Sequence, residues 1–204
     1  MTTRSGQISV SLFLILLLLQ FASPPSAGAA AFSDIQGHWA EGSINQLIAS
    51  QAISGYPDNT FRPENTITRA EFASILMKAF NFAPKANVVV FFDTYKHWAK
   101  DAISNATAYG IVSGYDAITF GPEDYVTREQ MALMIYHACS MEGSFQGKSF
   151  TDQSSISSWA NDAVAAVSQK NLMGGYADGS FRPRGLATRA EAATLISKAL
   201  KEKK

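Results

Sequence analysis

The sequence is poor in the residues that form cross-links and catalytic centres, with one cysteine and three histidines. The single cysteine, Cys139, cannot form an intramolecular disulfide, and its place in an apolar run favours a role in core packing. Neither sign of charge is in excess, since 17 basic residues stand against 17 acidic ones. Because a nucleic-acid-binding protein needs a basic face, nucleic acid is not expected as a partner.

Long apolar runs are also scarce outside the first thirty residues. That segment has Arg4 as its only charge, an apolar run over residues 12–19, then Pro24, Pro25 and the small residues 27–30. This order is typical of a signal peptide cleaved near Ala30, and the run is short for a membrane span. The alternative is an uncleaved anchor. Either way the body of the chain is expected outside the cytoplasm, with membrane contact only through this segment before cleavage.

What the sequence does contain is a repeat, which occurs three times with a period near sixty residues. The tryptophans Trp39, Trp98 and Trp159 are 59 and 61 residues apart. The same spacing holds for Gly-Tyr pairs, for a phenylalanine and a proline, and for Thr-Arg pairs, namely Gly55-Tyr56, Gly114-Tyr115, Gly175-Tyr176, Phe61, Phe120, Phe181, Pro63, Pro122, Pro183, Thr68-Arg69, Thr127-Arg128 and Thr188-Arg189. A fixed spacing indicates a fixed structural unit.

Each unit is predicted to be a helix, a loop and a second helix. In the first copy apolar residues recur at helical intervals from Trp39 to Ile48, Gly55 is expected to end that segment, and the loop has a tight turn over residues 57–59. The second helix starts at Thr68. It and its two counterparts present apolar stripes, formed by Phe72, Ile75, Leu76 and Ala79, by Met131, Met134, Ile135 and Ala138, and by Ala192, Leu195, Ile196 and Ala199. One helix pair buries too little surface to fold alone, so we expect the stripes to meet in one mainly α, pseudo-threefold domain.

These motifs resemble the S-layer homology repeat. The first copy carries it in Phe32-Ser33-Asp34, His38-Trp39-Ala40, Gly55-Tyr56, Phe61-Arg62-Pro63 and Ile67-Thr68-Arg69-Ala70-Glu71, and the third copy follows it closely. The second copy departs, with residues 116–120 altered in the loop and Glu129-Gln130 where the others read Ala-Glu. The resemblance implies a three-pronged, mainly helical domain around a central helical bundle. It also implies binding of secondary cell-wall polymers, often pyruvylated, and attachment of exported proteins to a bacterial surface.

The expected organisation follows from the motifs. A signal peptide spans residues 1–30, repeats span residues 31–82, 91–141 and 150–200, linkers span residues 83–90 and 142–149, and residues 201–204 form a charged tail. No cargo region follows the third repeat. The chain is therefore expected to be a wall adaptor, a competitor for anchoring sites or a fragment of a longer protein.

Each Thr-Arg pair combines a helix-capping threonine with an arginine at the first helical position, where a positive charge is unfavourable. Threonine with Glu71, Gln130 or Glu191 three residues later forms a capping box. Arginine at the first helical position opposes the positive end of the helix dipole, so capping does not explain it. Free N–H groups with a guanidinium suit a carboxylate or phosphate. The sequence therefore predicts that the three arginines hold the acidic group of the polymer, namely Arg69, Arg128 and Arg189. The alternative is structural ion pairing with the recurring aspartates Asp34, Asp93 and Asp152, which are also counted among the candidate polysaccharide-binding residues.

Other repeated residues admit two interpretations. The tryptophans Trp39, Trp98 and Trp159 could stack on sugars, although core packing is the favoured prediction. The glycines could let a ligand approach the backbone, although left-handed helix caps are favoured, for Gly55, Gly114 and Gly175. The tyrosines of the Gly-Tyr pairs are expected either to line a groove or to cover the core.

Catalysis is not expected. A glycosidase needs two differently tuned carboxylates in one cleft, whereas these acidic positions are triplicated or capping. The histidines are too few for a zinc site, Ala117 breaks the calcium-like pattern of the loops, and no cofactor is predicted. We therefore expect a non-enzymatic protein, attached non-covalently to the wall by an anionic polysaccharide in grooves between the repeats. The alternative is a structural or self-assembling surface-layer component with protein partners.

Overall fold

The computed structural model describes residues 32–86 and 88–203, so the expected signal peptide lies outside the described residues. The described part is mainly helical, which confirms the predicted fold class. Its α-helices are α1 (Glu41–Ala49), α2 (Arg69–Ala79), α3 (Lys100–Ala108), α4 (Arg128–Ala138), α5 (Asn161–Gln169) and α6 (Arg189–Glu202). Four 3-10 turns accompany them, namely η1 (Ser33–Ile35), η2 (Phe92–Thr94), η3 (Gln153–Ser155) and η4 (Ser158–Ala160). Within the two described stretches, no helix combines the length and the apolar character that crossing a membrane requires.

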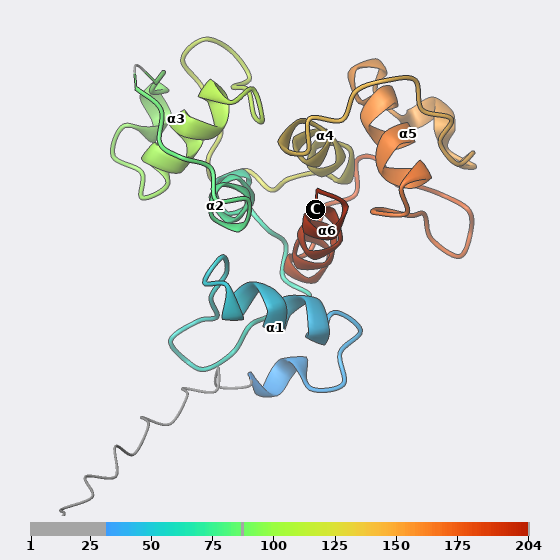
Figure 1. Cartoon of the computed structure of the whole chain (residues 1–204), viewed down its shortest axis with the longest axis horizontal. Helices are drawn as coiled ribbons and strands as arrows, with labels where there is room; N and C mark the ends of the chain where they lie inside the picture. Colours follow the sequence, from blue (N-terminus) through green and yellow to red (C-terminus); the bar gives the residue numbers. More distant parts are fainter. Residues whose placement is uncertain (1–31, 87, 204) are drawn as a thin grey trace, which may run out of the picture.

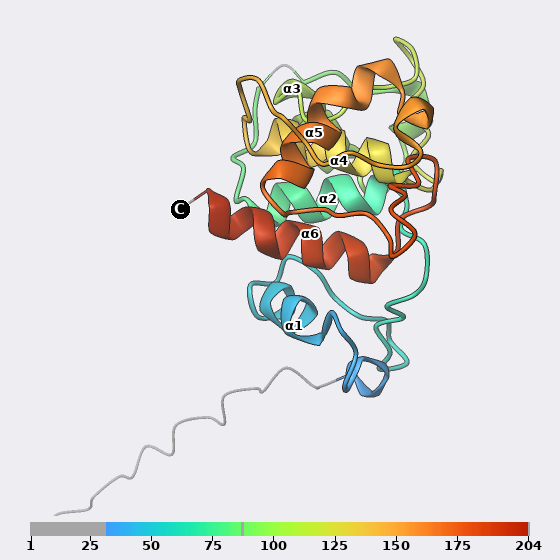
Figure 2. The ribbon, with the colours of Figure 1, turned by 90° about the vertical axis from the view of Figure 1, so that its right-hand side faces the viewer.

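The second helix of each repeat lies at the centre. Viewed end-on, α2, α4 and α6 form a three-helix bundle, and α1, α3 and α5 surround it as three prongs (Figure 1). The side view shows the central helices running alongside one another (Figure 2). Their predicted stripes are buried or nearly so, with Phe72, Met131 and Ile196 almost inaccessible. The expected pseudo-threefold core is therefore present.

The prongs do not coincide with the sequence repeats. The strongest helix packing joins α3 to α2, α5 to α4 and α1 to α6. Each first helix therefore packs on the second helix of another repeat, and α1 at the beginning of the described chain is completed by α6 at its end. This exchange closes the three repeats into a ring, so that no repeat has a complete core of its own.

A ring of backbone hydrogen bonds closes the N-terminal end of the bundle. Ile67 N–H donates to Ala187 O, Ala187 N–H donates to Val126 O, and Val126 N–H donates to Ile67 O, each at 3.0 Å. These residues directly precede the N-caps of the three central helices. The ring therefore fixes where the helices begin relative to one another.

The prediction that the glycines of the Gly-Tyr pairs cap the first helices is wrong. Helix α1 ends at Ala49, and the chain reverses through Gln51 with φ of 59°, so Gly55 does not provide the left-handed cap. A Cβ on Gly55 would collide with the ring of Phe32, and Gly114 and Gly175 meet Phe91 and Phe150 in the same way. Glycine is required at these positions because the first phenylalanine of each repeat packs on the backbone there. The expected turn at residues 57–59 is present, with Asn59 at φ of 62°.

Candidate functional site

The motif arginines are buried at the junctions between repeats. Only 6%, 4% and 5% of the surfaces of Arg69, Arg128 and Arg189 are exposed. Arg69 Nε donates to Phe120 O at 3.1 Å, and its Nη2 donates to Ser113 O at 2.9 Å. Both acceptors belong to the second repeat, whereas Arg69 belongs to the first. The guanidinium therefore connects two repeats through main-chain carbonyls.

The same connection occurs at the other two junctions. Arg128 Nε and Nη2 donate to Phe181 O at 2.9 Å and Gly174 O at 2.8 Å. Arg189 Nε and Nη2 donate to Phe61 O and Ser54 O, both at 3.0 Å, and so connect the third repeat to the first. Each guanidinium also lies over aromatic rings of the repeat that it contacts. The three arginines therefore have a structural role, because each one holds two repeats together.

The helix N-termini do not offer the free N–H groups that were expected. Thr68, Thr127 and Thr188 form the predicted capping boxes, which satisfy the third helical N–H. The N–H of Arg69 donates to Asp124 O at 2.8 Å, and that of Ala70 donates to Pro122 O at 3.1 Å. The corresponding groups of α4 and α6 have equivalent partners. Because the neighbouring repeat satisfies these donors, any anion must be held by side chains.

The alternative pairing of arginine with aspartate is also wrong. Asp34 accepts from Phe61 N–H at 2.9 Å and Arg62 N–H at 2.6 Å, both in its own repeat. The other two aspartates, Asp93 and Asp152, accept from the equivalent backbone groups. Burial alone would raise the pKa of Asp152, but the hydrogen bonds from the backbone outweigh it and lower that pKa. These aspartates close the loop of each repeat instead of neutralising arginine.

The tryptophans are on the surface, contrary to the favoured prediction of core packing. The exposed fractions of Trp39, Trp98 and Trp159 are 63%, 67% and 50%. The small Ala that follows each tryptophan is buried in its place. An exposed indole provides a flat apolar face together with an N–H donor. The sequence predicted the wrong environment because the first helix is short and the tryptophan lies just before its first turn.

One groove of about 720 Å³ combines three of the sequence-predicted residues, Arg69, Gly114 and Trp159. Tyr115, Gln130 and His137 also line it. Its side chains come from all three repeats, since Arg69 belongs to the first, Tyr115 and Gln130 to the second, and Trp159 to the third. We call it the Arg69 groove. Burial lowers the pKa of Arg69, with the nearby Tyr115 acting against this, and raises the pKa of Tyr115.

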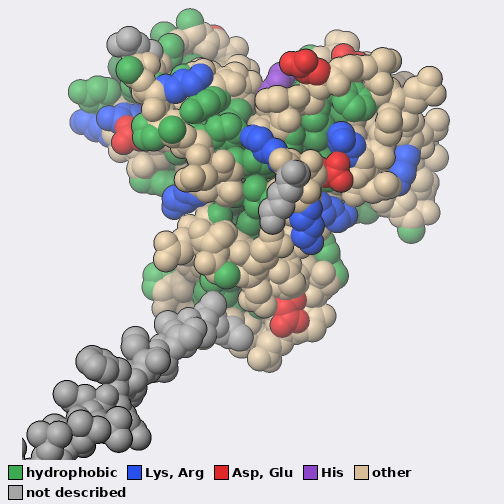
Figure 3. Space-filling model, viewed as in Figure 1, with side chains coloured by type: hydrophobic (Ala, Val, Ile, Leu, Met, Phe, Trp, Pro, Cys, Tyr) green, Lys and Arg blue, Asp and Glu red, His purple; other side chains and the backbone are tan. Residues whose placement is uncertain are grey.

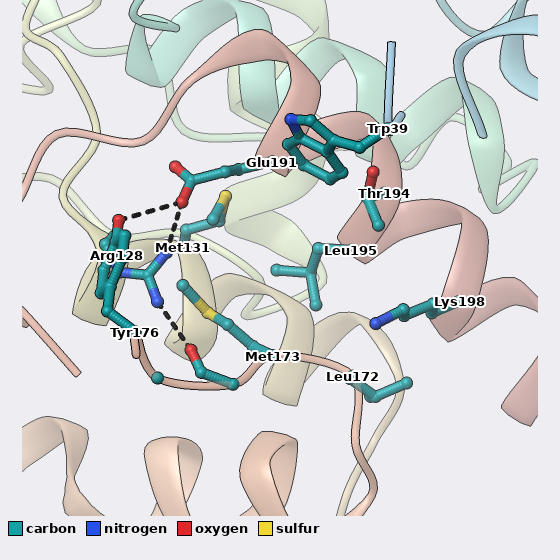
Figure 4. Close-up of a pocket in the computed structure, with 12 residues that line it drawn as sticks. Trp39, Arg128, Met131, Leu172, Met173, Tyr176, Glu191, Thr194, Leu195 and Lys198 are labelled. Carbon is teal, nitrogen blue, oxygen red and sulfur yellow. Dashed lines mark hydrogen bonds and ion pairs between the residues drawn. The ribbon is translucent and has the colours of Figure 1, made fainter. Parts of the chain in front are cut away.

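A second groove, of about 250 Å³, is the equivalent site one repeat further along. In this Arg128 groove, Arg128, Gly175, Tyr176 and Trp39 occupy the places of Arg69, Gly114, Tyr115 and Trp159 (Figure 4). The third set of residues repeats the stacking of the arginine on two aromatic rings. Trp98 lines a different hollow with Ser74, Lys78 and Asn105, while Arg189 lies over Tyr56 and Phe61.

The two grooves differ in whether their arginine has an ion-pair partner, because of the last residue of the capping box, while Lys198 gives the Arg128 groove a second cation. In the Arg128 groove, Glu191 Oε1 accepts from Arg128 Nη1 at 2.6 Å and from the Tyr176 hydroxyl at 3.2 Å (Figure 4). Gln130 is the equivalent residue in the Arg69 groove and carries no charge. Within residues 32–86 and 88–203, no carboxylate forms an ion pair with Arg69, and its Nη1 has no hydrogen-bond acceptor. The sequence already showed that the second repeat has Gln130 where the other repeats have glutamate. Only the fold shows that this glutamine lies beside Arg69 of the first repeat.

Comparisons with known proteins agree with this architecture. The model of the S-layer homology domain family matches residues 31–73, 91–132 and 149–193. A cellulosome-anchoring protein of Acetivibrio thermocellus is 35% identical over 156 residues, which is 72% of this chain and 35% of that protein. An S-layer protein of Bacillus anthracis is 32% identical over 185 residues, 89% of this chain and 21% of that protein. An exoglucanase of Acetivibrio thermocellus is 34% identical over 174 residues, 82% of this chain.

The chain spans only part of these relatives, 16% of the exoglucanase and 21% of the S-layer protein. The shared region is therefore the repeat region. The family match at three tandem positions confirms the recognition of three repeats, and with the surface-layer relatives it confirms a secreted location at the cell surface.

Proposed function

Because the chain belongs to the S-layer homology domain family, we propose that it anchors non-covalently to the cell surface by binding an anionic polysaccharide linked to the wall, and that it has no catalytic role. The acidic group of that polymer, a pyruvyl carboxylate among the candidates, would bind in the Arg69 groove. The expected sites at Arg128 and Arg189 contribute less, since Glu191 and Glu71 face those arginines.

The observation that carries this proposal is that Arg69, unlike Arg128 and Arg189, has no carboxylate within ion-pair distance among the described residues. Within that part of the chain, only the more distant carboxylates of Asp124 and Asp93 act on its charge. A buried cation without a carboxylate partner has lost hydration that an ion pair would replace. Its Nε and Nη2 are used by Phe120 O and Ser113 O, so Nη1 is the donor left for a ligand. A carboxylate arriving in the groove would supply both the missing charge and the missing acceptor.

The walls of the Arg69 groove suit a sugar. Tyr115 and Trp159 are 55% and 50% exposed, so each presents an aromatic face to a ligand. Arg69 lies 4.7 Å from the ring centroid of Tyr115, which keeps the cation and the aromatic surface adjacent. A polysaccharide that carries an acid group would use both features at once, with the acid at Arg69 and the sugar face at the rings.

The test is an exchange of one capping residue between the grooves. Gln130→Glu gives the Arg69 groove the carboxylate that Glu191 provides beside Arg128, and the fold tolerates glutamate there because Glu71 and Glu191 occupy equivalent capping boxes. We expect binding to purified walls to weaken by roughly tenfold or more, equivalent to about 1.4 kcal/mol. The matched control is Glu191→Gln, which removes the carboxylate from Arg128 and is expected to preserve or strengthen binding.

Wall sedimentation with the exported chain measures both variants. Walls from which the secondary polymer has been removed should bind neither the wild type nor the variants. If Gln130→Glu binds as the wild type does while polymer-free walls bind nothing, anchoring stands and the Arg69 groove is not its site. If polymer-free walls bind the wild type fully, the polysaccharide itself is the wrong ligand.

A further inference from the structure

The second repeat carries exposed apolar side chains at the outer end of its prong. The exposed fractions of Phe92, Tyr95 and Ile118 are 85%, 69% and 65%, and Val89 and Val90 are also exposed. We call these five residues the repeat-2 patch. Hydrophobic side chains are visible along the outer edge of the prong that contains α3 (Figure 3). Single exposed apolar residues are ordinary, but several in one place need an explanation.

Backbone hydrogen bonds hold the patch together. Phe92 N–H donates to Ile118 O at 2.8 Å, so the turn η2 and the loop of the second repeat lie side by side. Tyr95 N–H donates to Phe92 O at 3.4 Å within the same turn. Val89 and Val90 lie on the segment that leads into this turn, separated from it by the buried Phe91. Phe92, Tyr95 and Ile118 therefore lie on two adjoining backbone segments, and Val89 and Val90 lie on the segment that leads into them.

The other two repeats show that the fold does not require this surface. At the three central positions the first repeat has Ser33, Gln36 and Asn59, and the third has Thr151, Ser154 and Gly179. The loops differ in detail, since Asn59 and Gly179 have positive φ and Ile118 does not, and the 3-10 turn of the third repeat begins two residues later. The first repeat, however, forms the equivalent 3-10 turn with polar residues. The apolar residues of the second repeat therefore add no necessary packing and remain in water. Three apolar replacements on one surface suggest selection for contact with another molecule.

The loop of the second repeat has also lost its charges. In the other repeats an exposed ion pair crosses the loop, Asp58 to Arg62 at 2.7 Å and Asp178 to Arg182 at 2.9 Å. Ala117 and Gly121 replace both partners in the second repeat. The remaining acid, Asp116, accepts from the N–H groups of Ile118 and Thr119 at 2.8 Å. The loop is therefore apolar at its centre, and the charges beside it are Asp93, Lys96 and Asp116.

We propose that the repeat-2 patch joins two copies of this chain in a twofold-symmetric dimer. A twofold contact places the same apolar side chains opposite one another, so no separate complementary surface is needed. Without Arg4 of the expected signal peptide, the exported chain has 16 basic residues against 17 acidic ones, a formal charge near −1 that gives two copies little mutual repulsion. Each patch exposes on the order of 500 Å², so the dimer buries about 1,000 Å² in total, which is the lower limit for a specific, weak interface.

The dimer would have a consequence at the wall. Two linked chains bring two sets of grooves to one surface, so that release of one leaves the other bound. Attachment would then be stronger than either chain achieves alone. The dimer itself does not depend on what the grooves bind, and its test involves no wall material.

Sedimentation equilibrium of the exported chain tests the proposal, over concentrations from about 1 to about 200 μM, the range suited to a weak interface of this size. The expected result is an average molar mass that rises with concentration toward twice that of the monomer. The variant Phe92→Ser, Tyr95→Gln, Ile118→Asn carries the residues of the first repeat and should remain monomeric with an unchanged circular dichroism spectrum.

A matched control changes exposed apolar residues elsewhere. Tyr125→Thr with Leu186→Thr introduces the residue that the first repeat has at Thr66, and this control should associate as the wild type does. A wild type that stays monomeric throughout the range overturns the proposal, and so does association that survives the triple change. If the wild type is monomeric and the triple variant loses wall binding, the patch contacts the wall and the proposed partner is wrong.

Discussion

At the scale of single residues, the same side-chain type has different roles in different repeats because its partner differs. Arg69 and Arg128 begin equivalent helices and bond equivalent carbonyls. Gln130 leaves the charge of Arg69 available, whereas Glu191 neutralises Arg128. An amide nitrogen in place of one carboxylate oxygen therefore decides which of these two arginines has an ion-pair partner.

The loop aspartates provide a prediction at this scale. Hydrogen bonds from Thr60 and Arg62 lower the pKa of Asp58 to about 2, and the equivalent bonds from Ser180 and Arg182 lower the pKa of Asp178. Their folded pKa values lie below the unfolded value of 3.8, so the associated stability is present above about pH 4 and is lost as the pH falls toward about 2. The variant Asp58→Ala, Asp178→Ala copies Ala117 and lacks this contribution.

We expect the wild type to exceed that variant in urea midpoint at pH 6, and the difference to shrink as the pH falls from 4 to 2. The measurement is urea unfolding, followed by circular dichroism, at several pH values. A difference between the two midpoints that stays constant over this range would contradict the prediction. The difference between the two urea midpoints should also be smaller in high salt, because both ion pairs are exposed and salt screens them.

At the scale of elements, a buried carboxylate accompanies the insertion in the third repeat. Glu129 is 4% exposed and accepts from the N–H and hydroxyl of Ser157, at 2.9 Å and 3.0 Å. The equivalent residues in α2 and α6 are Ala70 and Ala190, and the prongs on which these two helices pack lack the two additional residues before the tryptophan. Glu129 therefore fixes the start of η4, which carries Trp159 into the Arg69 groove.

A double-mutant cycle tests this coupling. Ser157→Ala removes one donor from the buried carboxylate and should lower the free energy of unfolding by about 1–2 kcal/mol. Once Glu129→Ala has removed the carboxylate, the serine change should cost much less, giving a coupling of about 1 kcal/mol. Urea unfolding of the four proteins measures the cycle. Additive effects would mean that the two residues do not act as a unit.

At the scale of the whole molecule, the exchange of helices makes the three repeats one folding unit. Each outer helix packs on the central helix of a different repeat, and α1 requires α6. Both grooves likewise use side chains of all three repeats. A chain with fewer repeats would therefore lack part of its core and part of every groove.

Arg189 tests this closure because it connects the two ends of the described chain. It donates to Ser54 O, 135 residues away, and to Phe61 O, 128 residues away. Arg189→Met leaves these carbonyls without their donor and should lower the free energy of unfolding by about 2–4 kcal/mol. We expect tryptophan fluorescence and circular dichroism to report one common transition. Separate transitions for the first repeat and the remainder would show that the ring is not cooperative.

The sequence alone determined the features that depend on neighbouring residues. The threonine caps, the apolar stripes and the turn at residues 57–59 were predicted correctly because their causes lie within a few positions in the chain. The triplication also predicted one pseudo-threefold core, since no single helix pair could bury its own stripe. Anion binding by the arginines remains a prediction.

Only the tertiary structure decided the environments that depend on distant residues. It placed the tryptophans on the surface, assigned the aspartates to the backbone, and satisfied the helix N–H groups with carbonyls of the next repeat. Arg69 meets its partners 44 and 51 residues further along the chain. Periodicity and capping contain no information about such contacts, because they arise from the way in which the three repeats exchange helices and close into a ring.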